Sequence, residues 1–411
     1  MYKKRSITEK LRRQAAAFPV VAVTGARQVG KSTLLRHEFG KGADMVVFDP
    51  VVDVENARRD PELFLNNHKT PLILDEVQYA PEVIAAIKRR VDKKRTPGQY
   101  LLTGSQQWGV LKTMAESLAG RVVFLDLEGF SLSEIAEAYP KKSWLQRWIE
   151  SPQKVIKSKP RRLSLPVSTS EQLWRGWFPE AQRLPLESIP DFFQAYLRTY
   201  IERDVRLLAD VSDLHTFSSF VRLVAALTAQ EVNFSELGRE LGLTSQTAKR
   251  WLHVLEATFQ WFSIPSFTGN LIKRISGKPK GYFFDTGLAC YAQAVSSPVA
   301  LLGHPLWGAV FETAVVTEIR KCVATMSSPP RMYHWKRYSG AEVDLILERD
   351  GVYYPIEIKA SSQPSRKDTL GMSAFRAAYP HLKVAPGLVV CPTQKCLQIS
   401  ELDFAMPWDS L

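Results

Sequence analysis

The stretch FPVVAVTGARQVGKSTLLRHEF, residues 18–39, decides the fold of the first half of this 411-residue chain. It contains Gly25, four further residues, and then Gly30, Lys31 and Ser32, a full match to the pattern G-x-x-x-x-G-K-[ST]. The β-rich letters VVAVT precede the first glycine, and the letters STLLRHEF continue with helical spacing. A strand, a glycine loop and a helix N-terminus in this order point successive backbone N–H groups at phosphate oxygens.

This loop predicts bound ATP with Mg²⁺. Lys31 would reach the β- and γ-phosphates, and the hydroxyl of Ser32 would be a ligand of the metal ion. We expect the nucleotide contacts to come from the loop and the first turn of the helix, through Gly25, Ala26, Arg27, Gln28, Val29, Gly30, Lys31, Ser32 and Thr33.

A second motif, TPLILDEVQYA at residues 70–80, supplies the carboxylates that such a loop needs. Its continuous apolar run is typical of a parallel strand that is buried on both faces. Asp75, at the end of this run, is placed to hold Mg²⁺ through water, and Glu76 is placed to polarise the attacking water. The pair therefore predicts hydrolysis of ATP and not binding alone.

Two further residues, Ser105 and Arg121, each have two possible roles. Ser105 follows the strand candidate QYLLTG, where it would either sense the γ-phosphate or form a polar turn. Arg121 precedes the run VVFLDL, where it would either act as an arginine finger on the nucleotide of a neighbouring subunit or remain a surface charge.

Strand candidates alternate with helical segments throughout this half of the chain. They lie near residues 19–24, 44–48, 71–75, 99–104 and 121–127. This alternation predicts a doubly wound, parallel α/β domain.

Composition narrows the class of protein. Apolar residues make up 45% and charged residues 23% of the chain, as is usual for a globular protein with several domains. No apolar run is long enough to cross a bilayer and the N-terminus lacks the apolar core of a signal peptide, so we expect a cytoplasmic protein. The four cysteines are expected to be free or buried thiols. A net charge of +12 favours a polyanionic partner, nucleic acid ahead of a membrane face.

The motifs TGARQVGKST, LILDEVQ, LLTGSQ and SLAGR together resemble a family of bacterial and archaeal AAA+ ATPases. In that family the ATPase domain is followed by a C-terminal domain long catalogued as of unknown function. The resemblance covers nearly the whole chain and is more specific in its first half. It implies ATP-driven work on a macromolecule, in homo-oligomers that often form rings.

Residues 140–190 are rich in proline, basic residues and tryptophan, which predicts an insertion or linker. Its tryptophans could stack on nucleic acid or belong to a partly ordered surface loop. In the helical segment that follows, Arg203 and Arg206 are open candidates for approaching the nucleotide across a domain boundary.

The segment VNFSELGRELGLTSQTAKRWLHVLEAT, residues 232–258, predicts a helix-turn-helix. Ser235 would cap a first helix, Gly242 would end it, and Thr244 or Ser245 would cap a second helix. The second helix would bury Ala248, Leu252 and Leu255 and present Gln246, Lys249, Arg250 and His253 outward. The two β segments around the basic turn KRISGKPK at residues 273–280 complete a winged helix, which contacts duplex DNA or serves as a packing module.

The C-terminal third contains a hairpin signal, Asp350-Gly351, between two β-rich runs. If these two residues form the loop, Arg349 faces Val352 and Asp344 lies directly opposite Glu357. Lys359 then shares a face with Glu357, because side chains alternate along a strand. Two facing carboxylates repel each other unless a cation lies between them, and a divalent metal is the usual one.

This Asp followed by Glu-x-Lys, with an acid on the preceding helix, resembles the restriction-endonuclease-like superfold. The resemblance implies that Asp344, Glu357 and Lys359 are catalytic and that Glu312 or Glu318 completes a metal site with Asp344 and Glu357. Val343 departs from the family pattern, in which proline is expected before the aspartate. The alternative is an inactive nuclease-like domain that is used for binding.

The sequence thus predicts four parts: an AAA+ ATPase domain (1–139), a basic tryptophan-rich linker (140–190), a helical and winged-helix domain (191–295) and a restriction-endonuclease-like α/β domain (296–411). The leading hypothesis is an ATPase that binds branched or unusual DNA and remodels it or cuts it with a metal ion. The alternative is a regulatory NTPase whose C-terminal half binds a protein and has no nuclease activity.

Overall fold

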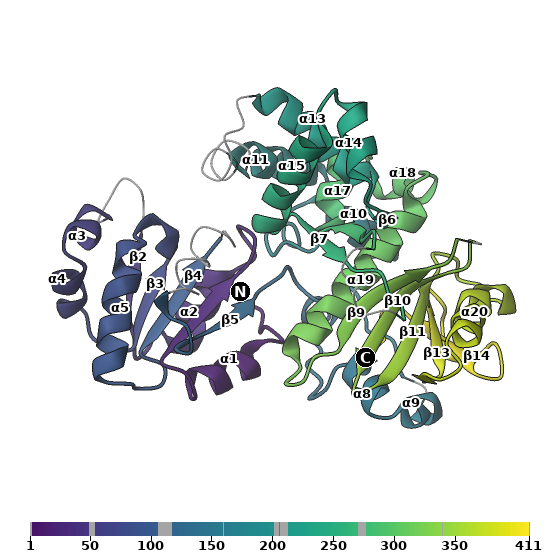
Figure 1. Ribbon diagram of the computed structural model, residues 1–411, viewed down its shortest axis with the longest axis horizontal. Coiled ribbons are helices and arrows are strands. Elements are labelled where there is room, and N and C mark those ends of the chain that lie inside the picture. Colours follow the sequence, from purple (N-terminus) through teal and green to yellow (C-terminus); the bar gives the residue numbers. More distant parts are fainter. Residues whose placement is uncertain are drawn as a thin grey trace.

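The computed structural model describes residues 2–48, 54–105, 117–158, 160–200, 205, 213–269, 277–338 and 340–410. Within these ranges the chain forms three lobes (Figure 1). We call residues 2–139 the N-terminal lobe and residues 164–302 the middle lobe. The C-terminal lobe comprises residues 303–410 together with residues 140–163, which pack beside it. Among the described residues, no helix combines the length and the apolar composition that crossing a membrane requires.

The N-terminal lobe is built on a parallel sheet of five strands in the order β2-β3-β4-β1-β5. The strands are β1 (Val20–Thr24), β2 (Asp44–Val47), β3 (Leu72–Asp75), β4 (Tyr100–Gly104) and β5 (Val122–Asp126). All five predicted strands are therefore confirmed. The helices described around them are α1 (Thr8–Ala15), α2 (Lys31–Phe39), α3 (Val54–Arg59), α4 (Pro61–Asn66), α5 (Glu82–Lys93) and α7 (Leu132–Ile135).

The strand order decides where the functional ends of the strands meet. Strand β4 lies between β1 and β3, so the carboxyl ends of these three strands are adjacent at one edge of the sheet. Side chains along each strand alternate between two apolar cores, one on each face of the sheet. Burial on both faces explains why the strands β1, β3 and β4 are continuous apolar runs in the sequence.

The tryptophans of residues 140–190 do not belong to a partly ordered surface loop, which was one of the two alternatives for them. Residues 140–190 contain the helices α8 (Trp144–Glu150), α9 (Pro152–Ser158) and α10 (Thr169–Arg175). The four tryptophans of this segment belong to the largest apolar core, and Trp148 is only 1% exposed. The hydroxyl of Tyr354 donates to the Ile149 carbonyl over 2.9 Å and so ties α8 to the C-terminal sheet. The apolar faces of these indole rings, and not the surrounding basic residues, decide how the segment folds.

The middle lobe is mainly helical and carries one small antiparallel sheet in the order β6-β8-β7. Its strands are β6 (Gln230–Glu231), β7 (Trp261–Ile264) and β8 (Lys280–Phe283). Its helices are α11 (Ile189–Tyr200), α13 (Leu214–Ala226), α14 (Phe234–Glu240), α15 (Ser245–Ala257), α17 (Thr286–Ala292) and α18 (Pro298–Leu302). The predicted tip of the basic turn, residues 273–276, lies outside the described residues, as do Arg203 and Arg206.

The two helices predicted in residues 232–258 are present as α14 and α15. Asn233, not Ser235, caps the first helix, because its side chain accepts from the backbone of the second and third residues after it. Gly242 has a φ of 66° and ends the helix, and Thr244 caps α15 as expected. The predicted apolar positions of α15 are buried.

The C-terminal lobe is a mixed sheet with α19 (Trp307–Thr325) on one face and α20 (Leu370–Ala378) on the other. The order is β14-β15-β13-β11-β10-β9, with β12 beside β11. The strands are β9 (Arg331–Lys336), β10 (Glu342–Arg349), β11 (Val352–Ile358), β12 (Lys383–Val384), β13 (Gly387–Cys391), β14 (Leu397–Gln398) and β15 (Asp403–Pro407). The β10–β11 hairpin has the predicted register, with Arg349 opposite Val352. Asp350 and Gly351 both have positive φ, as a tight two-residue loop requires.

A buried carboxylate, Asp285, fixes the middle lobe, and we predict that Asp285→Ala destabilises the protein. Its oxygens accept from the backbone N–H groups of Trp177, at 2.7 Å, and Leu288, at 2.9 Å. Leaving both donors buried without a partner should cost about 2–5 kcal/mol in urea-induced unfolding followed by tryptophan fluorescence. Asp213→Ala, which removes the exposed cap of α13, should cost only about 1 kcal/mol. Equal losses in the two variants would contradict this role for Asp285.

Candidate functional site

The glycine loop between β1 and α2 has the backbone geometry that its sequence predicts. A Cβ at Gly25 would lie 2.1 Å from the Leu127 carbonyl oxygen, so only glycine fits there. Gly30 has a φ of 97° and starts α2 from the left-handed region, which is costly for other residues. The loop therefore turns tightly from the end of β1 into the first turn of α2.

Lys31 is buried at the start of α2, and its ammonium lies against this loop. Its Nζ donates to the carbonyls of Gly25 and Ala26 over 3.0 and 2.8 Å. The adjacent Ser32 donates from its hydroxyl to Oδ1 of Asp75 over 2.7 Å. The loop and the end of β3 are thus already in contact through the two residues expected to serve the same metal ion.

Glu76 directly follows Asp75 and has a φ of 56°, an uncommon conformation for a residue other than glycine. Its backbone N–H donates to the Thr103 hydroxyl over 2.9 Å. Its carboxylate accepts from Gln78 and, over 3.2 Å, from the hydroxyl of Ser105. Ser105 therefore lies next to the predicted catalytic carboxylate, at the end of the strand between β1 and β3. Its predicted role as a γ-phosphate sensor stays a prediction.

A cavity of about 560 Å³ opens over this loop. Its floor includes Gly30, Lys31, Ser32 and Glu76, and the predicted contacts Gln28 and Thr33 also line it. The opposite wall comes from the middle lobe and consists of Pro179, Glu180, Arg183, Phe192, Ala195, Tyr196 and Thr199. The cavity therefore lies between two lobes, and its volume is in the usual range for small-molecule pockets.

These residues fit a nucleotide with Mg²⁺. Ser32 and Asp75 are oxygen donors in mutual contact, which is the ligand type that Mg²⁺ prefers. Gln78 and Thr103 also belong to the site, although we did not predict them from the sequence. Their positions in the sequence could have indicated them. Gln78 is two residues beyond Glu76, and Thr103 is near the end of β4, the strand beside β3.

Arg121 lies at the other end of the sheet, because it precedes β5 while the glycine loop follows β1. Its Nε pairs with Asp92 over 2.5 Å, and its Nη1 donates to the Ala119 carbonyl over 2.8 Å. Arg121 therefore does not serve the nucleotide site of its own chain. A role toward a neighbouring subunit stays a prediction.

The C-terminal carboxylates surround a lysine that we had assigned to the basic turn. Lys280, on β8, is only 9% exposed, and its Nζ lies 2.6 Å from Oε1 of Glu312 and 2.9 Å from Oδ1 of Asp344. Burial opposes the charge of this lysine, but the two carboxylates outweigh burial and raise its pKa. The other oxygen of Asp344 accepts from the Ile358 N–H over 2.9 Å.

Glu357 and Lys359 form a second pair beside this cluster. Lys359 Nζ donates to Oε1 of Glu357 over 2.6 Å, while Oε2 of Glu357 is buried without a hydrogen-bond partner. Burial and the charge of Asp344 raise the pKa of Glu357 to about 8, although Lys359 partly offsets them. Burial and Asp344 likewise raise the pKa of Glu312 to about 7, against the influence of Lys280.

The prediction of a metal site at Glu312, Asp344 and Glu357 is therefore wrong in its geometry. The described part of the chain contains no group of three or more His, Cys, Asp or Glu side chains placed to hold a metal ion. An ammonium group lies between Glu312 and Asp344, where the sequence predicted a divalent cation. Glu318, the other candidate acid, faces the N-terminal lobe, where it accepts from the Leu132 N–H over 3.1 Å.

Three family models match the chain. Residues 17–136 match the AAA domain, residues 168–299 match a domain of unknown function (DUF8612), and residues 307–411 match a domain of unknown function (DUF4143). Residues 17–136 are a P-loop ATPase domain. The matched range contains the glycine loop, Asp75 and Glu76.

Relatives of the whole chain have been found in mycobacteria. The uncharacterized proteins Mb2031c of Mycobacterium bovis and Rv2008c of Mycobacterium tuberculosis are each 27% identical over 412 residues, which span 100% of this chain and 85% of theirs. Among solved structures, the Walker-type ATPase PABY2304 of Pyrococcus abyssi is similar, with 15% identity, a TM-score of 0.44 and coverage of 71% of this chain and 96% of that one. The RuvB Holliday junction branch migration motor of Thermotoga maritima has 13% identity, a TM-score of 0.29 and coverage of 66% and 92%.

The ion pairs of Lys280 with Glu312 and Asp344 lead to a prediction for Lys280→Met. The variant should be less stable than the wild type, and its melting temperature should depend on divalent cations. Removing the ammonium leaves two buried carboxylates facing each other, which should cost about 3–5 kcal/mol of stability. Millimolar Mn²⁺ should then raise the melting temperature of the variant and leave that of the wild type unchanged. Lys336→Met removes an exposed pair with Glu342 in the same sheet and should show neither effect. A variant as stable as the wild type would contradict the buried ion pair.

The raised pKa of Glu357 predicts a stability that falls as pH rises. Between the ordinary value of 4.5 and about 8, the folded protein keeps a proton on Glu357 that the unfolded chain has lost. Stability therefore decreases with pH across this window. The glutamine of Glu357→Gln cannot titrate. Between pH 5 and pH 9 the free energy of unfolding of this variant should therefore fall by at least ~1 kcal/mol less than that of the wild type, which corresponds to about one pKa unit. Parallel pH profiles of the two proteins would show that Glu357 ionises normally.

Proposed function

We propose that this chain couples ATP hydrolysis to binding of duplex DNA, and that α15 is the helix that contacts the DNA. The observation that carries this proposal is the division of α15 into two faces. Ala248, Leu252 and Leu255 are buried, while Gln246, Lys249, Arg250 and His253 are exposed. Amide, ammonium and guanidinium groups on one exposed helix face are suited to phosphates and to base edges in the major groove.

The surroundings of α15 support a winged-helix interpretation. Helix α14 precedes it through a turn at Gly242, and the strands β7 and β8 of the small sheet follow it. In DNA-binding helix-turn-helix modules, the second helix is the one that enters the major groove. The net charge of +12 also favours a polyanion as partner.

The ATPase chemistry follows from the side chains of the N-terminal lobe. Bound ATP would supply the phosphoryl group, and Ser32 and Asp75 would hold its Mg²⁺. Backbone N–H groups at the start of α2 and the ammonium of Lys31 bind and orient the phosphates. Glu76 is oriented by Gln78 and Ser105, and its carboxylate accepts a proton from the attacking water.

For the C-terminal lobe we propose a restriction-endonuclease-like fold that binds DNA without cutting it. The mixed sheet between α19 and α20 supports the fold assignment. The ion pairs of Lys280 with Glu312 and Asp344 support binding over cleavage, because the carboxylates are already neutralised. We further propose a homo-oligomer, with Arg121 serving the neighbouring subunit, since it lies at the sheet edge away from its own nucleotide.

The test is steady-state ATP hydrolysis with and without duplex DNA at a fixed salt concentration of about 100 mM. We expect duplex DNA to raise kcat several-fold in the wild type. Lys249→Glu/Arg250→Glu should keep the basal rate, lose the stimulation and bind DNA at least tenfold more weakly. Lys93→Glu/Lys94→Glu makes the same charge change on the exposed end of α5 and should behave as the wild type. Lys31→Ala should abolish hydrolysis with and without DNA.

The outcomes that would contradict the proposal distinguish its separate parts. If DNA leaves the wild-type rate unchanged, the DNA proposal is wrong and a protein partner becomes the better hypothesis. If strand cleavage occurs with Mg²⁺ or Mn²⁺ and is lost in Asp344→Ala, the C-terminal lobe is a nuclease despite Lys280. Branched, duplex and single-stranded DNA should all be compared, since the preferred structure determines the size of the effect.

A further inference from the structure

The N-terminal arm places an arginine inside the protein. Arg5 is only 4% exposed, and all three nitrogens of its guanidinium have acceptors. Its Nη1 donates to the Val29 carbonyl over 2.7 Å. Its Nη2 donates to the carbonyls of Glu128 and Gly129 over 2.6 and 3.3 Å. Its Nε pairs with Oε2 of Glu134 over 3.1 Å.

The first of these contacts is made to the glycine loop itself. Val29 immediately precedes Gly30, and a Cβ at Gly30 would lie 3.6 Å from Nη1 of Arg5. The guanidinium therefore lies directly behind the peptide that leads into Lys31 and Ser32. Because its donors form a rigid planar fork, it fixes the distance between this peptide and the acceptors on its other side.

The other acceptors belong to residues 128–134, which we call the bridge segment. Glu134 is held by more than Arg5: its Oε1 accepts from the Ser6 N–H over 2.5 Å, and its Oε2 accepts from the Ser131 N–H over 3.0 Å. Ser131 and Glu134 also form a capping box that starts α7. The carboxylate that orients Arg5 is thus fixed by several donors.

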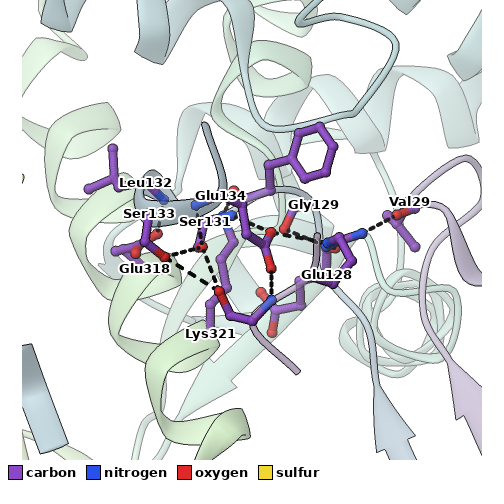
Figure 2. A network of polar contacts seen from close by, with 12 residues as sticks. Val29, Glu128, Gly129, Ser131, Leu132, Ser133, Glu134, Glu318 and Lys321 are labelled. Atoms are coloured by element: carbon purple, nitrogen blue, oxygen red, sulfur yellow. Dashed lines mark hydrogen bonds and ion pairs between the residues drawn. The ribbon is translucent and has the colours of Figure 1, made fainter. Parts of the chain in front are cut away.

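Helix α19 of the C-terminal lobe holds the bridge segment from the opposite side. Lys321 Nζ donates to the Phe130 carbonyl over 2.8 Å. Glu318 Oε2 accepts from the Leu132 N–H over 3.1 Å, and Arg320 pairs with Glu128 over 2.9 Å. Figure 2 shows the bridge segment between Val29 on one side and Glu318 and Lys321 on the other. One short segment is thus bonded to the glycine loop through Arg5 and to α19 directly.

We propose that Arg5 is a positioning residue for ATP hydrolysis, and that through the bridge segment α19 of the C-terminal lobe sets the position of the glycine loop. Its side chain also borders the cavity, but its hydrogen bonds go to Val29 and to the bridge segment, so it acts by holding Val29. Displacement of a catalytic loop by about 1 Å can reduce a rate by about two orders of magnitude. This inference rests on the ATPase activity but does not depend on whether DNA is the partner.

The test measures basal ATPase activity without DNA, together with thermal unfolding. Arg5→Met should lower kcat/KM for ATP at least tenfold, and Arg5→Lys should restore part of the loss, since it returns the charge without the fork. Arg13→Met is the matched control, because Arg13 belongs to the same basic arm and its side chain is exposed. It should leave kcat and KM within twofold of the wild type.

A remote variant separates positioning from simple stability. Lys321→Met removes the bond to Phe130 from the C-terminal lobe and should lower kcat/KM by about threefold or more. The double variant Arg5→Met/Lys321→Met should lose less than the product of the single losses, as expected for residues in one network. If Arg5→Met and Arg5→Lys melt earlier but keep wild-type kcat and KM, the role of Arg5 is structural and the proposal is wrong. An inactive wild type would instead overturn the ATPase assignment itself.

Discussion

A buried positive charge needs an acceptor, because an unpaired ion inside a protein costs several kcal/mol. In this chain that constraint joins the lobes. Lys280 on β8 of the middle lobe pairs with Glu312 and Asp344 of the C-terminal lobe. Lys321 on α19 reaches the Phe130 carbonyl of the N-terminal lobe. Separation of the lobes would leave these groups without partners, so their ion pairs and hydrogen bonds hold the three lobes in one arrangement.

The parts of the fold that could be predicted are those whose cause is local in the sequence. The strands of the N-terminal lobe are continuous apolar runs because both faces of the sheet are covered, and each was found within a residue or two of its ends. The Asp350-Gly351 loop fixed the register of the β10–β11 hairpin, because a two-residue turn leaves one pairing. The glycine loop was equally local, since Gly25 and Gly30 occupy backbone conformations and spaces that exclude other residues.

What could not be predicted depends on partners distant in the sequence. Lys280 belongs to a run of basic residues, which usually indicates a solvated surface, yet its partner Asp344 is 64 positions away. Arg5 looks like any charge of a basic N-terminal arm, but its acceptors lie as far away as Glu134. The tryptophans of residues 140–190 suggested a surface segment by composition, but their burial depends on elements distant in the sequence. Helix α8 packs on α19, and Trp174 donates to the Val295 carbonyl of the middle lobe.

The charges around Lys280 explain why its ammonium, without a metal ion, can offset the carboxylates of Glu312 and Asp344. A divalent cation would neutralise Glu312 and Asp344 together, whereas Lys280 carries one charge. The pKa of Glu312 is raised to about 7 by burial and by Asp344, so near neutral pH this side chain carries a proton much of the time. Glu357, with a pKa of about 8, is mostly protonated under the same conditions. The ammonium of Lys280 remains paired with Asp344 over 2.9 Å. Side chains and protons of the protein itself thus compensate much of the charge at the place where the sequence predicted a metal ion.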